Sequence, residues 1–315
     1  MLRQFSWVVH LHTEYWSVLS DDEVEWALPR FVLFTILAMI GRLRRARNQA
    51  RMEIEMIRTV TASRYIVPLR EGGSLPAVVE ADDGALYVMK FIGAGQGPKA
   101  LIAELIAGEI GRALGLNVPE LVFMELSPLL ARTERDEEIL DLLRASIGLN
   151  LGMRFLPGAF TYNPLLQPPP PADLASAVVW FDAFVTNVDR TDRNVNLLLW
   201  QQALWLIDHG AALYFHHDWA TYHQRARSPF PHVTQHTLLR LASELEAADA
   251  HAHRHLDAAQ FEAIVAETPD AWLALDAAFG DPATLRAAYV AYLTERLEDS
   301  AIFVEEAVRA RGLLI

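Results

Sequence analysis

Short apolar runs separated by turn residues characterise the first half of the chain. Residues 64–69, 76–81 and 85–92 have the length and composition of strands, and turn sequences rich in glycine and aspartate lie between them. This pattern predicts a three-stranded antiparallel meander. Two later runs, residues 116–126 and 149–160, also predict strands, and the second contains a Pro-Gly stop.

Helical periodicity is strongest over residues 99–115, where alanine, leucine, isoleucine and glutamate recur and a glycine closes the run. A second helix is predicted over residues 172–187, after the stiff proline run 168–171, with Asp173 as its N-cap. Beyond Thr234 the apolar positions predict amphipathic helices. The chain therefore combines an early strand-rich part with a later helical part.

Polar side chains lie between two short apolar runs in the second half of the chain. The runs 197–200 and 204–208 are strand-like, and the connection between them is short enough for a hairpin. Asp189 and Asn194 then lie in the loop before the first strand, and Asp208 lies at the end of the second. Oxygen-bearing side chains at neighbouring strand ends can converge on one hard cation. The alternative is an Asx-rich turn that only stabilises the hairpin.

Composition and charge narrow the classes of protein. The chain has 315 residues, room for one large or two medium domains, and 52% of them are hydrophobic, which argues for a folded core. A net charge of -13 makes the surface as a whole repel nucleic acid and anionic membranes, so we expect no direct nucleic-acid binding. The sequence has no cysteine, which excludes disulfides and zinc-thiolate sites and fits a cytoplasmic protein.

Lysine is rare in this sequence. Of the 27 basic residues only two, Lys90 and Lys99, are lysines, so 25 are arginines. Such a bias suggests that lysine is kept where arginine would not serve, for example as a compact point charge against a phosphate. Lys90 lies on the third predicted strand. The alternative is that the two lysines have no common role.

Residues 1–55 differ from the rest of the chain. They include an apolar run at 31–40 and an arginine-rich segment at 41–51. Ten apolar residues cannot cross a bilayer core of about 30 Å as a helix, so we expect no transmembrane segment, and the run lies too far from the start for a signal peptide. Three interpretations stay open: a helix that docks on the core, an amphipathic surface anchor, or upstream sequence added by a misplaced start codon. We favour the first and the third.

Six features follow one another in order: a glycine-rich turn, a strand lysine, a helix glutamate, a later strand, an Asp-x4-Asn loop and an Asp-x-Gly triplet. Such an ordered set is far rarer by chance than any one of its members. With it the chain resembles the HipA-like kinases, which share a broader group with the phosphoinositide kinases. The segments YVMKF, AELIAGEIGRALGLNVPE, FDAFVTNVDRTDRN and LWLIDHG carry the resemblance, which covers about residues 59–215 and, more loosely, the helical tail.

The resemblance implies an α+β, two-lobed protein kinase-like fold. A small N-lobe with an antiparallel sheet is expected over residues 56–156 and a mainly helical C-lobe over residues 157–315, with residues 1–55 as an N-terminal extension whose status stays open. The sequence departs from the common protein-kinase pattern in three ways. Asp-His-Gly at 208–210 replaces Asp-Phe-Gly, the His-Arg-Asp triplet is missing, and no activation segment with an Ala-Pro-Glu end is visible.

The resemblance also implies which residues contact the nucleotide. Lys90 is expected to bind its phosphates and Glu104 to hold Lys90 in place, because Glu104 and not Glu109 has the family's spacing to the Gly-Leu-Asn-Val-Pro element. The predicted strand at 149–160 would be the hinge between the lobes, where backbone groups meet the adenine. Further contacts are therefore expected from the glycine-rich turn, at Gly72, Gly73 and Ser74, and from the hinge, at Met153 and Phe155. Ser74 is in addition a candidate for regulatory autophosphorylation.

The remaining expected roles concern the transfer itself. Asp189 would accept or orient the proton of the acceptor hydroxyl, and Asn194 and Asp208 would bind magnesium. The implied activity is that of an ATP- and magnesium-dependent kinase that phosphorylates a serine or threonine of a protein. A small-molecule or lipid kinase of the same fold and a catalytically silent nucleotide-binding module are the alternatives. Some HipA relatives act as toxins with an antidote, so an antitoxin-like partner is also considered.

Overall fold

The computed structural model describes residues 56–69, 75–95, 97–131, 136–165, 167–276 and 278–314. The chain divides into two compact units, Met1–Met56 and Ile57–Ile315, and every described helix and strand belongs to the second unit. The predicted N-terminal extension lies outside the described residues, and so does the glycine-rich turn with Gly72, Gly73 and Ser74.

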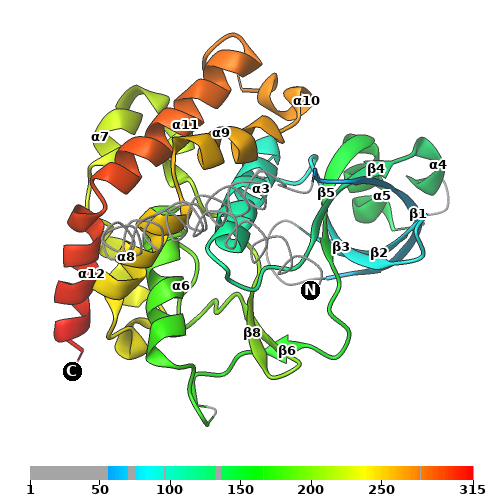
Figure 1. Cartoon of the computed structure of the whole chain (residues 1–315). Helices are drawn as coiled ribbons and strands as arrows, with labels where there is room; N and C mark the ends of the chain where they lie inside the picture. The colour runs from blue at the N-terminus through cyan, green and yellow to red at the C-terminus, as the bar shows by residue number, and fades with distance from the viewer. Residues whose placement is uncertain are drawn as a thin grey trace, which may run out of the picture. The chain divides into compact units, whose positions relative to one another are not determined.

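Five strands close into a barrel in the order β1-β2-β3-β5-β4 (Figure 1). They are β1 (Thr59–Pro68), β2 (Ala77–Ala81), β3 (Leu86–Lys90), β4 (Leu121–Leu126) and β5 (Gly148–Arg154). The first three strands pair antiparallel in sequence order, which confirms the predicted meander, and a parallel pairing of β1 with β4 closes the ring. Closure removes the unpaired strand edges that an open sheet would present to solvent.

Side chains alternate between the inside and the outside of this barrel. Along β3, Tyr87 and Met89 are fully buried in the core, so Lys90 lies on the opposite face of the strand. Along the chain, β4 is followed by two helices, α4 (Pro128–Ala131) and α5 (Glu137–Ala145), which precede β5. Leu143 of α5 is buried in the same core cluster as Tyr87 and Met89, so α5 is packed as part of the barrel.

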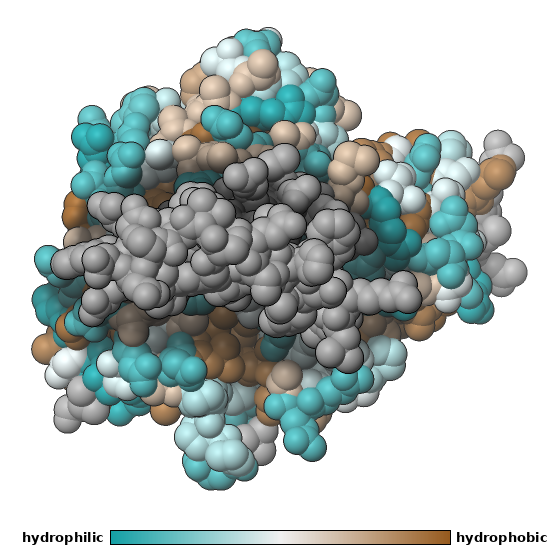
Figure 2. All heavy atoms as spheres, in the orientation of Figure 1, coloured by the Kyte–Doolittle hydropathy of each residue, from teal (hydrophilic) through white to brown (hydrophobic). Residues whose placement is uncertain are grey.

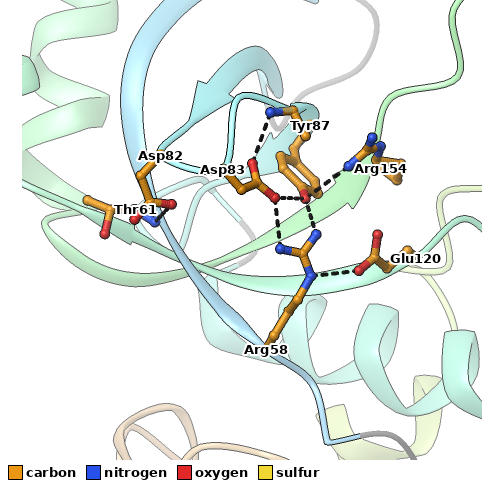
Figure 3. Close-up of polar contacts among 8 residues, drawn as sticks. Arg58, Thr61, Asp82, Asp83, Tyr87, Glu120 and Arg154 are labelled. Carbon is orange, nitrogen blue, oxygen red and sulfur yellow. Dashed lines mark hydrogen bonds and ion pairs between the residues drawn. The ribbon is translucent and has the colours of Figure 1, made fainter.

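A group of charged side chains surrounds the Tyr87 hydroxyl (Figure 3). Arg58 donates to Asp83 at 2.7 Å and to Glu120 at 2.8 Å, and it also donates to the Tyr87 hydroxyl. That hydroxyl donates to Asp83 at 2.8 Å and accepts from Arg154 at 3.3 Å. We name these five residues the Tyr87 cluster. It ties β3 to β5 and to the segments that precede β1 and β4.

The strongest predicted helix, residues 99–115, is observed as α3 (Gly97–Ala113). Gly115 follows its end with a φ of 80°, the left-handed conformation that commonly stops a helix at glycine. Most of α3 is buried, and it packs against β5, α9 (Ala258–Ala266) and α10 (Asp270–Leu273). The helix therefore links the barrel to the helical part of the chain.

The predicted hairpin is confirmed. It consists of β7 (Leu197–Trp200) and β8 (Ala203–Leu206), and β6 (Phe160–Thr161) adds a third strand. Gln201 and Gln202 form the two-residue turn with φ values of 50° and 63°, the left-handed conformation that matches the twist of paired strands. The second strand ends at Leu206 and not at Asp208, because Asp208 has a φ of 58° that cannot continue a strand.

The helical tail predicted after Thr234 is also confirmed. The remaining α-helices are α6 (Ala172–Phe184), α7 (Tyr222–Ala226), α8 (Leu245–His255), α11 (Pro282–Glu298) and α12 (Ala301–Gly312). The prediction of Asp173 as the N-cap of α6 is wrong. Pro171 is the N-cap and is held extended, so the helix starts one residue after it and Asp173 falls in the first turn. A carboxylate in that turn still interacts favourably with the helix dipole.

The visible surface is mixed in character. Figure 2 shows hydrophilic residues on both the barrel part and the helical part of one face. The sequence is 21% charged, which agrees with this distribution. A search of the described residues finds no helix that combines the length and the apolar character needed to span a bilayer.

Candidate active site

Lys90 joins three segments that are far apart in the sequence. Its Nζ donates to Glu104 Oε2 at 2.6 Å and to Asp208 Oδ1 at 2.5 Å. Lys90 ends β3, Glu104 lies within α3, and Asp208 lies in the turn after β8. We name these three residues the Lys90 cluster. The structure thus brings a strand lysine, a helix glutamate and a loop aspartate 118 residues from the lysine into one site.

The members of the Lys90 cluster differ in exposure. The side chains of Glu104, Lys90 and Asp208 are 0%, 15% and 49% exposed. Burial alone would raise the pKa of Glu104, but the Lys90 ammonium, with a contribution from His209, outweighs it and holds this pKa at about 2. Burial alone would lower the pKa of Lys90, but its two carboxylate partners raise it instead. Lys90 and Glu104 are therefore both ionised at neutral pH, and only the Asp208 edge of the cluster is widely open to a ligand.

His209, the residue after Asp208, is buried against the same glutamate. Its side chain is 0% exposed, and Nδ1 lies 3.5 Å from Glu104 Oε1. The ring also packs edge-on against Phe181, with centroids 5.7 Å apart. No role for His209 was predicted from the sequence, which showed only that histidine replaces phenylalanine in this triplet. Its packing fixes the turn that carries Asp208.

Asp189 and Asn194 lie together in the loop that precedes β7. Asn194 Nδ2 donates to Asp189 Oδ2 at 2.6 Å. The loop is also an Asx-rich turn, as the alternative interpretation held, because Asp189 N–H donates to Asn187 Oδ1 and Thr191 Oγ1 accepts from Asn194 N–H. Burial raises the pKa of Asp189, and the negative charge of Asp208 adds to this rise while the bond from Asn194 opposes it. The two carboxylates are thus close enough to interact.

The two hinge candidates lie beside the Lys90 face of the barrel. Met153 on β5 pairs with Val88 on β3, and Leu151 pairs with Lys90, so these side chains share one face of the sheet. Met153 is buried. Phe155 N–H donates to Leu86 O at 2.9 Å, so this backbone donor is already used within the barrel. Val88, Leu151 and Met153 therefore form an apolar patch beside Lys90, in which Leu151 and Met153 are buried.

Only one of the two lysines lies in this site. Lys99, in the first turns of α3, donates to the His216 carbonyl at 2.5 Å and pairs with Asp276 at 3.1 Å. These contacts tie the start of α3 to the segment after Asp208 and to the segment after α10. Lys99 thus has a structural partner, and the suggested phosphate contact remains for Lys90 alone.

The oxygen ligands in the site suit a magnesium ion that is bound together with phosphates. Among the described residues, no group of three or more His, Cys, Asp or Glu could hold a metal by itself. Magnesium at phosphate sites is held by one or two protein carboxylates, with phosphate oxygens and water completing the shell. Asp208 is half exposed, and Asn194 uses its amide nitrogen on Asp189, which leaves its carbonyl oxygen for another contact. Asp208 and Asn194 therefore fit such an ion.

Three buried polar residues in or near the loop with Asp189 and Asn194 had no predicted role: Asp182, Arg190 and His236. Asp182 accepts hydrogen bonds from both Arg190 and His236. The signal that could have found them is an aspartate in the otherwise apolar run of residues 178–185, because a buried carboxylate needs a partner.

Comparisons with known proteins point to kinases. A family model described as HipA-like kinase matches residues 63–305. The crystal structure of the Helicobacter pylori proinflammatory kinase CtkA is similar with a TM-score of 0.50 and 13% identity, over 82% of this chain and 99% of that chain. A crystal structure of the Golgi casein kinase with Mn and ADP bound has a TM-score of 0.44 and 12% identity, over 82% of this chain and 74% of that chain. A comparison with curated protein sequences found no match.

The likeness to CtkA, at 13% identity, concerns the fold alone. It confirms the expected α+β kinase-like fold, with a strand-rich small part and a mainly helical large part. The match of the family model begins in β1 and ends in α12, so it spans both parts.

Proposed function

Because the chain belongs to the HipA-like kinase family, it is a kinase-type phosphotransferase, and we propose that it transfers the γ-phosphoryl group of magnesium-ATP to a serine or threonine of a protein. The observation that carries this proposal is the Lys90 cluster, in which Lys90 Nζ bonds both Glu104 and Asp208. Such a lysine, held by a helix glutamate and facing a metal-binding aspartate, is the arrangement that phosphoryl transfer requires.

Lys90 provides the fixed positive charge for the nucleotide phosphates. Glu104 keeps this charge in place, since it is fully buried and ionised beside Lys90. Asp208 and Asn194 would hold the magnesium ion, which when bound neutralises negative charge on the β- and γ-phosphates. In this proposal the apolar face with Val88, Leu151 and Met153 receives the adenine.

Asp189 orients the acceptor hydroxyl and takes its proton. The raised pKa of Asp189 makes its carboxylate a better base than an ordinary aspartate. The bond from Asn194 holds one oxygen of Asp189, so the other is left for the acceptor. The two residues therefore place the base next to one of the proposed metal ligands.

The protein acceptor is proposed from membership of the family. An antitoxin-like protein stays a candidate partner of this chain, and no direct nucleic-acid binding is expected. A cytoplasmic location is proposed because the sequence has no cysteine. A small-molecule or lipid acceptor would leave the Lys90 cluster unchanged. The choice between a protein acceptor and a small-molecule or lipid acceptor therefore depends on a transfer experiment.

The test is transfer of labelled γ-phosphate by the purified full chain. With magnesium present, we expect label on a protein of a cell lysate, with phosphoserine or phosphothreonine after acid hydrolysis. The Asp208→Ala variant should lose the transfer, and the matched Asp192→Asn variant, in an exposed position of the same loop, should keep it. Label that appears only in a lipid or small-molecule fraction would contradict the protein acceptor. Transfer at the parental rate by Asp208→Ala would contradict the assignment of the site.

A further inference from the structure

A buried carboxylate organises the loop that carries Asp189. Asp182 on α6 accepts from Arg190 Nε at 2.6 Å, from Asn187 Nδ2 at 2.9 Å and from His236 Nε2 at 2.9 Å. The side chains of Asp182 and Arg190 are both 0% exposed. Burial alone would raise the pKa of Asp182, but the Arg190 guanidinium, with His236, holds it at about 2. The Asp182 carboxylate is therefore ionised inside the protein.

His236 is held in one tautomer. The backbone N–H of Leu238 donates to His236 Nδ1 at 3.0 Å, so Nδ1 is an acceptor and the ring proton is on Nε2. This Nε2–H then donates to Asp182. His236 thus adds a third donor to Asp182, from a segment that lies well after Asp208. The Asp182 carboxylate cannot rotate toward solvent without losing these three bonds.

The other side of the Arg190 guanidinium faces the two loops of the site. Arg190 Nη1 donates to the carbonyl of Asn196, which closes the loop, and to the carbonyl of Ile207 at 3.3 Å. Arg190 directly follows Asp189 in the sequence, and Ile207 directly precedes Asp208. A single rigid group therefore connects the neighbours of the two proposed functional carboxylates.

We propose that Arg190 is a positioning residue that sets the placement of Asp189 relative to Asp208, with Asp182 and His236 as its support. This inference rests on the proposed phosphotransfer. The guanidinium suits the task because it is planar and presents several donors in a fixed geometry, which a flexible ammonium does not. The Arg190 side chain is 0% exposed, so it acts through the backbone of Asn196 and Ile207.

Small displacements are enough to matter in such a site. Transfer requires the acceptor oxygen, the phosphoryl group and the leaving oxygen to lie in line, and Asp189 and Asp208 place opposite ends of that line. A shift of about 1 Å can lower a rate by about 100-fold. Nucleotide binding depends mainly on Lys90 and the barrel, which Arg190 does not contact. Loss of Arg190 should therefore lower kcat more than it raises KM for ATP.

The test compares Arg190→Lys with the parent protein in full-chain transfer assays. The variant keeps a positive charge for Asp182 but loses the Nη1 group that binds both carbonyls, so we expect kcat to fall about 100-fold with KM for ATP changed less than about threefold. The matched control is Arg286→Lys, which loses a bond to the Thr268 carbonyl and an ion pair with Asp270, away from the loop. It should lower Tm and leave kcat unchanged.

If Arg190→Lys does not fold, the double variant Asp182→Asn/Arg190→Gln removes both buried charges and keeps hydrogen-bonding amides. It should fold and show the same selective loss of kcat. Parental kcat in a folded variant, or a rise in KM for ATP as large as the fall in kcat, overturns this inference alone. Absence of transfer by the parent protein overturns the proposed function, and this inference with it.

Discussion

Two charged clusters lie on the same strand, and they differ in what they connect. The Tyr87 cluster and the Lys90 cluster start from residues three positions apart on β3, and each joins cations to carboxylates. In the Tyr87 cluster every partner lies in the barrel or next to it, and the Tyr87 hydroxyl has a full set of one donated and two accepted bonds (Figure 3). The Lys90 cluster instead reaches out of the barrel to α3 and to the turn after β8.

The difference shows that ion pairs of similar length can have different uses. All contacts of the Tyr87 cluster lie within the barrel or next to it, so this cluster holds strands together. The Lys90 cluster joins the barrel to the helical part, and its Asp208 side chain is half exposed. Burial separates the two as well, because Glu104 is fully buried and Glu120 of the Tyr87 cluster is 41% exposed. Substitution in the Tyr87 cluster should therefore affect stability alone. In the Lys90 cluster, substitution of Lys90 should affect transfer, and substitution of the buried Glu104 should mainly affect stability.

The largest effect is expected from Lys90→Met. The variant keeps a side chain of similar size but loses the charge that we propose for contact with the nucleotide phosphates, so the rate of transfer should fall by about 10²–10³-fold. The matched variant in the other cluster is Arg58→Met, which removes bonds to Asp83 and Glu120 and should lower Tm without changing kcat. The kcat of both variants is measured from initial rates with saturating ATP, and their Tm from thermal unfolding. Equal losses of kcat in the two variants would contradict the difference in role between the two clusters.

Glu104→Gln should be next in size, with its main effect on stability. Glu104 has a pKa of about 2 in the folded protein against an ordinary 4.5, so its ionised form stabilises the fold above that ordinary value and this contribution is lost as the pH falls toward 2. Removing one partner of a buried pair costs about 3 kcal/mol at neutral pH. The difference from the parent protein in the free energy of unfolding should shrink as the pH falls from 4.5 to about 2.

Urea denaturation over a pH series measures this difference. Glu120→Gln is the control, because its partner Arg58 is 43% exposed and an exposed pair contributes about 1 kcal/mol or less. If the two variants lost equal stability at neutral pH, burial would not distinguish the clusters. A difference for Glu104→Gln that did not change with pH would show that its charge is not the cause.

Tyr87→Phe should have the smallest effect of the three. It removes the hydroxyl shared by Arg58, Asp83 and Arg154 but leaves the Arg58–Asp83 pair, so a loss of about 1–2 kcal/mol is expected, with kcat and KM for ATP unchanged. Tyr162→Phe is the matched control. The Tyr162 hydroxyl is buried and has no hydrogen-bond partner among the described residues, so its removal should change Tm very little. A fall in kcat for Tyr87→Phe would link this cluster to transfer.

Parts of the fold and of the site could be predicted from local patterns. The hairpin follows from two apolar runs with a two-residue connection, and the end of α3 follows from Gly115. The N-cap of α6 could not be located in this way, because Pro171 and Asp173 are both suitable near a helix start. Only the packing of the helix decides whether Pro171 or Asp173 becomes its N-cap.

The sequence by itself determined the order of elements in the barrel meander, the hairpin and the loop with Asp189 and Asn194, because each depends on side chains a few residues apart. Local sequence pattern leaves the partner of Lys90 open between Glu104 and Glu109, the family resemblance selects Glu104, and the tertiary structure shows the contact. It places Glu104 against Lys90 and pairs Glu109 with its helix neighbour Arg112. It also decided that Arg190 is buried against Asp182 and touches the residue before Asp208. These contacts depend on how α3, α6 and the barrel pack, and no short stretch of sequence contains that information.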